Sequence, residues 1–340
     1  MESGIPIGAK GGCQVRRFAH ALLVAFAVCL GFAAAAQVLV VSTTTIVGDV
    51  VSRIAGEDVD VRTLLPIGAD PHTFEPTPQD LVLLTQAALV FANGAELEAS
   101  LEPILETASA PVVFLSDGLD LLPIGDSGRE EDHEASYDED HADDHEEAHD
   151  EEHGDEHVHE HGAYDPHVWF DPAYVEAWTH IIERELIALA PASAEGISTR
   201  ANAYRQELAS LDGWIAETVA SLPEDRRRLV SDHLVFGYFA ARYGFEQAGA
   251  ILPGGTTAAD PSARELADVI DTIRALDVSA IFVGETVASA LVEQVARDTG
   301  TRLVYLYTGS LSEVGGPAAS YIDLVRYDVR AMVDALMESP

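Results

Sequence analysis

Short apolar runs rich in β-branched residues alternate with segments of helical periodicity, and the alternation occurs twice along the chain. Such runs are typical of strands buried on both faces, in parallel sheets that helices cover. We therefore predict an α/β fold of two small lobes, each with a mostly parallel four-stranded sheet and helices. The predicted strands cover residues 38–42, 59–65, 88–92, 112–115, 229–231, 245–251, 280–283 and 303–306. The predicted helices between and after them cover residues 47–55, 78–86, 99–108, 234–243, 263–276, 288–299 and 317–337.

A long helical segment separates the two halves. Over residues 192–222, apolar side chains recur at helical spacing, among them Tyr204, Leu208 and Leu211. A helix of about 30 residues spans roughly 45 Å, which is enough to brace two lobes. We predict an N-terminal lobe over residues 37–191, one long rigid linking helix over 192–222, and a C-terminal lobe over 223–340.

The N-terminus has the organisation of a secretory signal. Lys10, Arg16 and Arg17 precede an apolar run over residues 18–32, and Ala34-Ala35-Ala36 follows as a small-residue cleavage pattern. The apolar run is short for a transmembrane span. We predict a signal peptide over residues 1–36, a mature start near Gln37, and export to the periplasm.

Both cysteines, Cys13 and Cys29, lie inside this segment. The mature chain is therefore predicted to lack disulfides and thiolate metal ligands. The residues before Cys29, Phe26-Ala27-Val28, match a lipidation motif poorly, so we expect no lipid anchor at Cys29.

The charge of the chain is strongly negative, with 58 acidic against 19 basic residues and a formal net charge of −39. This balance argues against nucleic acid or an anionic membrane surface as a partner. Residues 129–162 hold 17 of the acids, eight histidines and one arginine. We expect this segment to be a disordered loop that captures metals such as zinc weakly and at several places.

Only four histidines of the mature chain lie outside that loop. His180 falls inside a helical pattern, and we interpret it as an ordinary helix residue. His72 and His233 follow predicted strands in different lobes, and His167 lies on a segment that can join them. Ligands of parallel sheets bind at the carboxyl ends of strands. Three imidazoles with one further group suit zinc, so we predict a metal site.

Four aspartates flank these histidines. Asp70, Asp165, Asp171 and Asp232 could orient the rings by accepting the second ring N–H, or they could cap turns and helices. The sequence leaves both roles open. The stretch Gly254-Gly255-Thr256 is a turn signal to which we attach no phosphate chemistry.

Three motifs resemble those of a known family. GADPHTFEPTPQD, YDPHVWFDP and SDHLVFGYFAARYG are similar, in order and spacing, to the ligand motifs of the substrate-binding receptors of zinc and manganese ABC transporters. The resemblance covers nearly all of the mature chain, and an acidic, histidine-rich insertion before the second motif is common among zinc members. It implies a metal between the lobes, held by His72, His167 and His233, and a membrane permease with its ATPase as partner.

The chain departs from the family at one position. The family often supplies a fourth ligand, an aspartate, from a segment resembling LYTGSLSE, where this chain has Gly309. The fourth ligand could then be water, a histidine of the acidic loop, or Glu285 in FVGETVAS. We include Glu285 among the candidate metal ligands because it follows a predicted strand of the second lobe.

The resulting hypothesis is a monomeric periplasmic receptor that captures Zn²⁺ as transported ligand and delivers it to the permease; we do not expect an enzyme. Three imidazoles favour zinc over manganese, which prefers more carboxylate ligands. The substituted fourth position keeps a Mn²⁺ or iron receptor of the same family as the main alternative. A zinc hydrolase with Glu285 as base is a further alternative, although the chain has no HExxH motif. The last alternative is a metal-storage or adhesion protein that has no transporter as partner.

Overall fold

The computed structural model describes residues 37–124, 164–252, 254–287 and 290–338, together with Met1 and Gly4. The predicted signal peptide, both cysteines and the acidic loop over residues 129–162 lie outside the described residues. Within the described part of the chain, no helix is both long and apolar enough to cross a membrane.

Two separate four-stranded sheets form the framework, and all their strand pairs are parallel. The first has the order β2-β1-β3-β4 and the second the order β6-β5-β7-β8. The strands are β1 (Val38–Ser42), β2 (Val59–Thr63), β3 (Leu89–Ala92), β4 (Val112–Phe114), β5 (Arg228–Ser231), β6 (Glu246–Ala250), β7 (Ala280–Gly284) and β8 (Arg302–Leu306). The predicted fold class is confirmed, and each strand lies within two residues of its predicted bounds.

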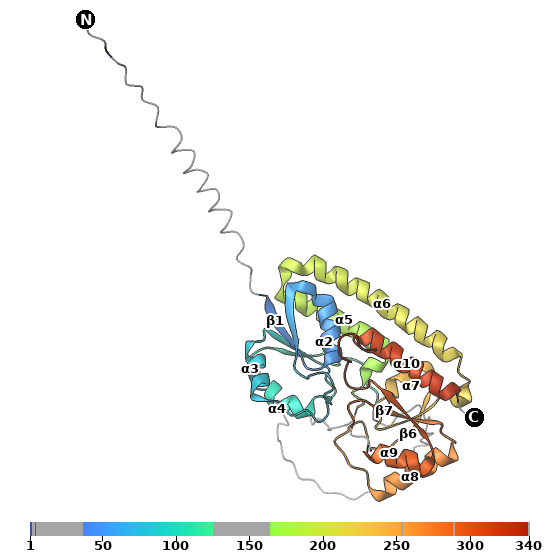
Figure 1. The fold of residues 1–340 in the computed structure, drawn as a ribbon. Helices are drawn as coiled ribbons and strands as arrows, with labels where there is room; N and C mark the ends of the chain where they lie inside the picture. Colours follow the sequence, from blue (N-terminus) through green and yellow to red (C-terminus); the bar gives the residue numbers. More distant parts are fainter. Residues whose placement is uncertain (2–3, 5–36, 125–163, 253, 288–289, 339–340) are drawn as a thin grey trace, which may run out of the picture. The chain divides into compact units, whose positions relative to one another are not determined.

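Helices follow most strands, as expected for parallel connections (Figure 1). The α-helices are α2 (Thr45–Ala55), α3 (Pro78–Gln86), α4 (Glu102–Leu105), α5 (Pro172–Leu189), α6 (Ala194–Ala220), α7 (Gly237–Tyr243), α8 (Ala263–Ala275), α9 (Ala290–Thr299) and α10 (Tyr321–Met337). Short 3-10 turns cover Gly56–Asp58, Ala99–Leu101, Val168–Phe170, Pro191–Ser193 and Glu224–Arg226. The helix predicted over residues 99–108 is therefore a 3-10 turn followed by one turn of α-helix.

Local capping explains where several helices begin. The Thr44 side chain accepts from the Val47 N–H at the start of α2, and Asp171 accepts from the Ala173 N–H at the start of α5. In α8, Ser262 and Glu265 form a reciprocal capping box. Each cap satisfies N–H groups that have no partner inside the helix, so the chain enters these helices at defined residues.

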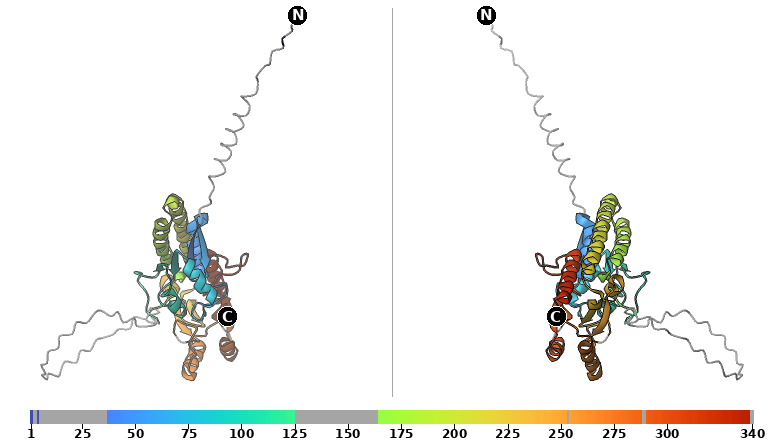
Figure 2. Two further views of the ribbon diagram at one scale, coloured as in Figure 1. Left: turned by 90° about the vertical axis from the view of Figure 1, so that its left-hand side faces the viewer. Right: turned by 90° about the vertical axis from the view of Figure 1, so that its right-hand side faces the viewer.

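The long helix α6 packs against both halves of the molecule. It contacts α5 and α2 of the first half and α10 of the second, and Figure 2 shows α5 and α6 standing together as a pair. Its buried face includes Tyr204, Leu211 and Val219. One hydrophobic cluster runs through this region and includes Val40 in the first sheet and Leu229 in the second. The described residues from Val38 onward thus form one compact unit, and the lobe boundaries at 191 and 222 stay a prediction.

The C-terminal helix α10 ties the second half back to the first. The Tyr321 N–H donates to Asp49 Oδ2 of α2 over 3.0 Å, and the Tyr321 hydroxyl donates to the Trp169 carbonyl over 2.8 Å.

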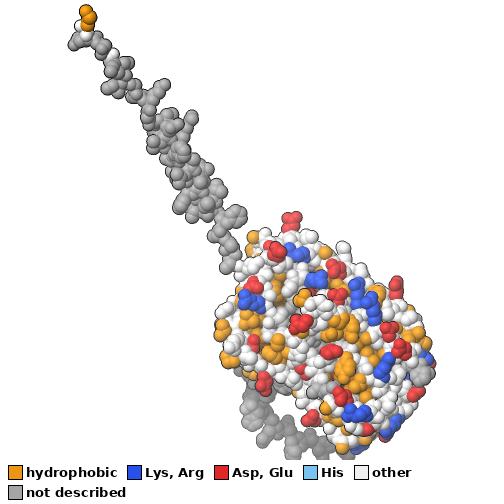
Figure 3. Space-filling view, viewed as in Figure 1, with side chains coloured by type: hydrophobic (Ala, Val, Ile, Leu, Met, Phe, Trp, Pro, Cys, Tyr) orange, Lys and Arg blue, Asp and Glu red, His pale blue; other side chains and the backbone are white. Residues whose placement is uncertain are grey.

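The face shown in Figure 3 carries basic side chains scattered among acidic ones. Residues 129–162 carry 1 − 17 = −16 of the net charge of −39, so the negative charge is most concentrated in that segment.

Candidate metal centre

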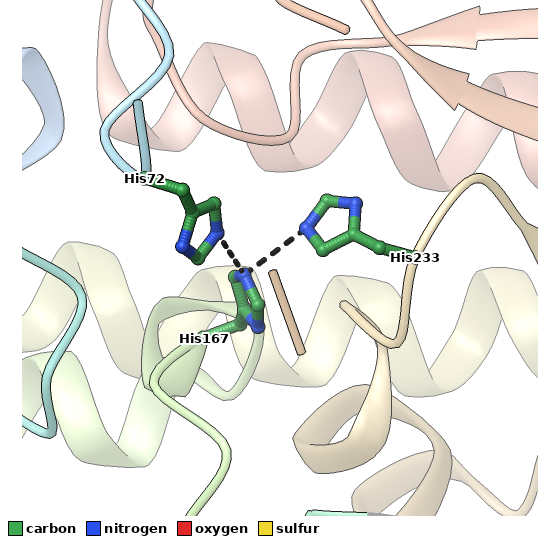
Figure 4. A group of neighbouring side chains, drawn as sticks. All are labelled: His72, His167 and His233. Carbon is green, nitrogen blue, oxygen red and sulfur yellow. Dashed lines mark hydrogen bonds between the residues drawn. The ribbon is translucent and has the colours of Figure 1, made fainter. Parts of the chain in front are cut away.

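Three histidines from distant parts of the chain converge at one point (Figure 4). His72 lies between β2 and α3, His167 between β4 and α5, and His233 directly after β5. The Nε2 atoms of His72 and His167 are 3.1 Å apart, and those of His233 and His167 are 3.2 Å apart. The structure thus brings together three of the four candidate ligands, two from the first half and one from the second.

The ring spacing fits a metal ion. Two Zn–N bonds of 2.0–2.1 Å at a tetrahedral angle place the nitrogens about 3.3 Å apart. An octahedral arrangement with slightly longer bonds gives a similar separation. The spacing therefore suits a divalent metal and does not by itself choose among metals.

Two buried aspartates orient two of the rings. Asp165 Oδ1 lies 2.7 Å from His167 Nδ1, and Asp232 Oδ1 lies 2.7 Å from His233 Nδ1. Each of these oxygens also accepts the backbone N–H of its histidine. A carboxylate acceptor places the ring proton on Nδ1, so each Nε2 presents a lone pair to the centre. Two such lone pairs 3.2 Å apart repel each other unless a proton or a cation lies between them.

The other two flanking aspartates have different roles. Asp171 caps α5. Asp70 Oδ1 accepts the backbone N–H of His72 over 3.0 Å, and Asp70 Oδ2 accepts the Thr257 hydroxyl over 2.5 Å. The alternatives left open by the sequence are therefore resolved residue by residue: Asp165 and Asp232 hold rings, Asp171 caps a helix, and Asp70 links a turn to the second half of the molecule.

Burial favours the neutral form of two of the imidazoles, those of His72 and His167, by lowering their pKa. It lowers the pKa of His72 well below the ordinary value, and the neighbouring His167 and His233 lower it further. Burial also lowers the pKa of His167, although its hydrogen bond to Asp165 acts in the opposite direction. A neutral imidazole is the form that binds metal, so these shifts keep lone pairs available at neutral pH.

The pocket around the histidines is lined by mixed polar and apolar groups. Apart from the three histidines, its lining consists of Asp70, Pro71, Trp169, Thr257, Thr286, Thr308 and Gly309. Glu285 is exposed and is not brought to the three histidines; its backbone N–H donates to the Leu306 carbonyl, and its neighbour Thr286 takes the place in the lining. His180 is exposed on α5, in keeping with its interpretation as an ordinary helix residue.

Gly309 lies where the two halves of the molecule meet. A Cβ at this position would lie 3.0 Å from Pro71 Cδ and 3.3 Å from Thr286 Oγ1. An aspartate there would have to displace Pro71, which is next to His72. The glycine is thus matched to a close approach, and position 309 supplies no side-chain ligand.

Sequence reasoning missed two side chains next to the ligands. Asn93 Nδ2 donates to the Pro166 carbonyl over 3.0 Å and thereby holds the residue before His167. Thr257 reaches Asp70, as described above. The Asn93-Gly94 pair at the end of β3 was an available signal for the first. No pattern in the sequence pointed to the second.

Two parallel-sheet lobes that place three imidazoles around one point are typical of one class of protein, the two-lobed metal-binding receptors. The family described as "Zinc-uptake complex component A periplasmic" matches residues 40–335, and the chain belongs to this family. It is therefore a substrate-binding protein of a metal ABC transporter, a solute-binding receptor and not an enzyme.

Relatives with different metals in their names are similar to the chain over most of its length. The manganese-binding lipoprotein MntA of Halalkalibacterium halodurans is 29% identical over 301 residues, covering 88% of each chain. The iron-binding protein YfeA of Yersinia pestis is 28% identical, covering 85% of this chain and 83% of its own. The structure of the periplasmic zinc-binding protein TroA of Treponema pallidum superposes with a TM-score of 0.72 at 27% identity, covering 88% of this chain and 99% of its own.

Proposed function

We propose that the chain captures Zn²⁺ with His72, His167 and His233 and passes it to a membrane permease driven by its ATPase. One observation carries the proposal: the Nε2 lone pairs of His167 and His233 face each other over 3.2 Å while buried carboxylates hold both Nδ1 protons. This arrangement is stabilised by a cation at the centre. The metal is cargo, so the site must bind it tightly and still release it.

The donor set supports zinc over manganese. Three imidazoles converge, and among the described residues no carboxylate joins their group. Imidazole suits zinc, whereas manganese prefers carboxylate, carbonyl or water oxygens. Because relatives are named for manganese and for iron, a receptor for either metal is the second candidate.

The fourth position is part of the proposal. Gly309 supplies nothing, and Glu285 reaches the metal only if the segment after β7 moves. A water molecule or a histidine of residues 129–162 then completes the site. The threonine hydroxyls of the lining could hold such a water by hydrogen bonds.

Calorimetric titration of the metal-stripped mature protein with Zn²⁺, and separately with Mn²⁺, tests the metal. We expect one tight zinc site, several weaker ones that disappear when residues 129–162 are deleted, and weak manganese binding. His180→Ala is the matched control, since it removes an exposed imidazole. Equal or stronger manganese binding would overturn the zinc proposal, and loss of the tight site on loop deletion would assign a ligand to the loop.

We also propose export to the periplasm. Six relatives are named lipoproteins, which counts against our expectation that Cys29 carries no lipid. The intact mass of the mature protein decides the point. A chain that starts near Gln37 agrees with the expectation, and a lipid-modified chain that starts at Cys29 overturns it. Sedimentation of the same sample tests the expected monomer.

A further inference from the structure

A short loop of the second half, residues 254–257, contacts each of the three segments that carry the histidines. Its first contact is with the His233 segment, because the Leu234 N–H donates to the Gly254 carbonyl over 3.0 Å. Leu234 is the residue directly after His233. The loop is thereby fixed to the end of β5 on its own side of the molecule.

The second contact is with the segment of His167. Gly255 is buried, and a Cβ at this position would lie 3.2 Å from Ile124 Cδ1 and 3.7 Å from Pro166 Cδ. Pro166 directly precedes His167, and Asn93 holds its carbonyl from the other side. The loop backbone thus lies close against Ile124 and in ordinary van der Waals range of the residue before His167.

The third contact is with the segment of His72. The Thr257 hydroxyl donates to Asp70 Oδ2 over 2.5 Å, and Asp70 Oδ1 accepts the His72 N–H over 3.0 Å. The aspartate therefore joins the loop to the backbone of His72. Hydrogen bonds to charged groups are among the stronger ones in proteins, so this contact can hold the turn of His72 toward the second half.

We propose that residues 254–257 are a positioning element that assembles the three-histidine site across the two halves, with Thr257 as the positioning residue for His72. The inference rests on the proposed metal function and adds a residue to it. Thr257 acts through Asp70 and is not a metal ligand. Its hydroxyl sets how long the His72 turn stays in place, and hence how fast bound metal is released.

Thr257→Val tests the proposal, because valine has nearly the shape of threonine and lacks the hydroxyl. We expect the rate of Zn²⁺ release to a chelator to rise about tenfold and the affinity to fall by a similar factor. Thr257→Ser keeps the hydroxyl and should restore both. Thr256→Val is the matched control, since the Thr256 hydroxyl accepts a local bond from the Ala258 N–H, two residues further along the loop.

A spectroscopic readout separates positioning from general destabilisation. The absorption of Co²⁺ bound in place of Zn²⁺ reports ligand geometry, and we expect it to change in Thr257→Val and not in Thr256→Val. The thermal midpoint of the metal-free protein should be the same in both variants. If Thr257→Val fails to fold, Thr257→Ala, which also removes the hydroxyl, provides the same comparison.

The outcomes distinguish this inference from the function on which it rests. Wild-type protein without a tight Zn²⁺ site would overturn the proposed function. Tight wild-type binding, with Thr257→Val indistinguishable from Thr256→Val in release rate and Co²⁺ spectrum, would overturn the role of Thr257 alone.

Discussion

The three histidines are held in two different ways. The rings of His167 and His233 are almost completely buried, and each is fixed by a hydrogen bond from Nδ1 to a buried aspartate one or two residues before it in the chain. His72 is partly exposed, and its turn is held instead by contacts from the other half of the molecule. Two ligands are therefore set by their own segments, and the third by how the halves meet.

The contacts of the surrounding segments also differ between the two buried ligands and His72. The Tyr238 hydroxyl of α7 donates to the Asp165 carbonyl over 2.8 Å, so the His167 segment is coupled to the helix that follows His233. The turn of His72 meets the second half through three small contacts, at Gly68, Asp70 and Pro71. Their partners are the Ser310 hydroxyl, the Thr257 hydroxyl and Gly309. We expect capture and release of metal to depend mainly on this turn.

The largest effect should follow removal of the central ligand. His167 lies within 3.2 Å of both other Nε2 atoms, so His167→Ala removes the imidazole that both partners face. We expect tight Zn²⁺ affinity to fall by about a hundredfold or more, and His72→Ala and His233→Ala to cost at least about tenfold. Competition against a chelator of known affinity measures this. Near-wild-type affinity in any of the three variants would remove that residue from the site.

The next effect concerns the aspartates that fix the rings. Asp165→Asn and Asp232→Asn should each weaken Zn²⁺ binding by about 10–100-fold, because an amide holds the ring proton less firmly than a carboxylate. The Asp232→Asn substitution should weaken binding more than Asp165→Asn, since Asp232 Oδ2 also accepts the Gly284 N–H over 2.6 Å. Asp171→Asn is the matched control, because Asp171 caps a helix. Equal losses in the control and in the ring-fixing variants would show that the effect is structural.

This division between ligands also marks how far the sequence could lead. The central strands β1, β3, β5 and β7 were predictable because they are short apolar runs with mostly buried side chains. The edge strands β2, β4, β6 and β8 are partly exposed. His72 and His233 were predictable because they follow predicted strands, and His167 because it lies on a segment that can join them. Asp171 precedes Pro172 at a helix start, which is a capping signature, whereas nothing in the sequence distinguishes Asp165 or Asp232 as holding a ring. The contact of Thr257 with Asp70 spans 187 residues, and Glu285 follows a strand end yet points to solvent. Such contacts depend on how the halves meet, which local patterns do not encode.

A smaller effect is expected from pH in the metal-free protein. Burial lowers the pKa of His72 and of His167, so the unfolded chain binds more protons than the folded chain just below the ordinary histidine pKa. The contribution of these two histidines to stability should therefore be constant above about pH 7 and fall as the pH drops below about 6.5. Thermal unfolding of the wild type and of His72→Gln between pH 5 and 8 measures this contribution as the difference between the two curves. The same pH dependence in both proteins would contradict the assignment.

The smallest effect should come from substitution of Glu285. It tests whether the contrast between the fixed ligands, His167 and His233, and the movable ligand, His72, still holds when metal is bound. The side chain is exposed, its segment is tied to β8 by the bond from its backbone N–H to Leu306, and Thr286 occupies the lining. Glu285→Ala should therefore change Zn²⁺ affinity by less than about twofold, as expected for a surface substitution. Glu313→Ala, at another exposed acid of the second half, controls for the loss of one negative charge. A tenfold loss of Zn²⁺ affinity in Glu285→Ala but not in Glu313→Ala would mean that metal draws the segment after β7 into the site. The second half would then hold one fixed ligand, His233, and one movable ligand, Glu285, as the first half holds His167 and His72.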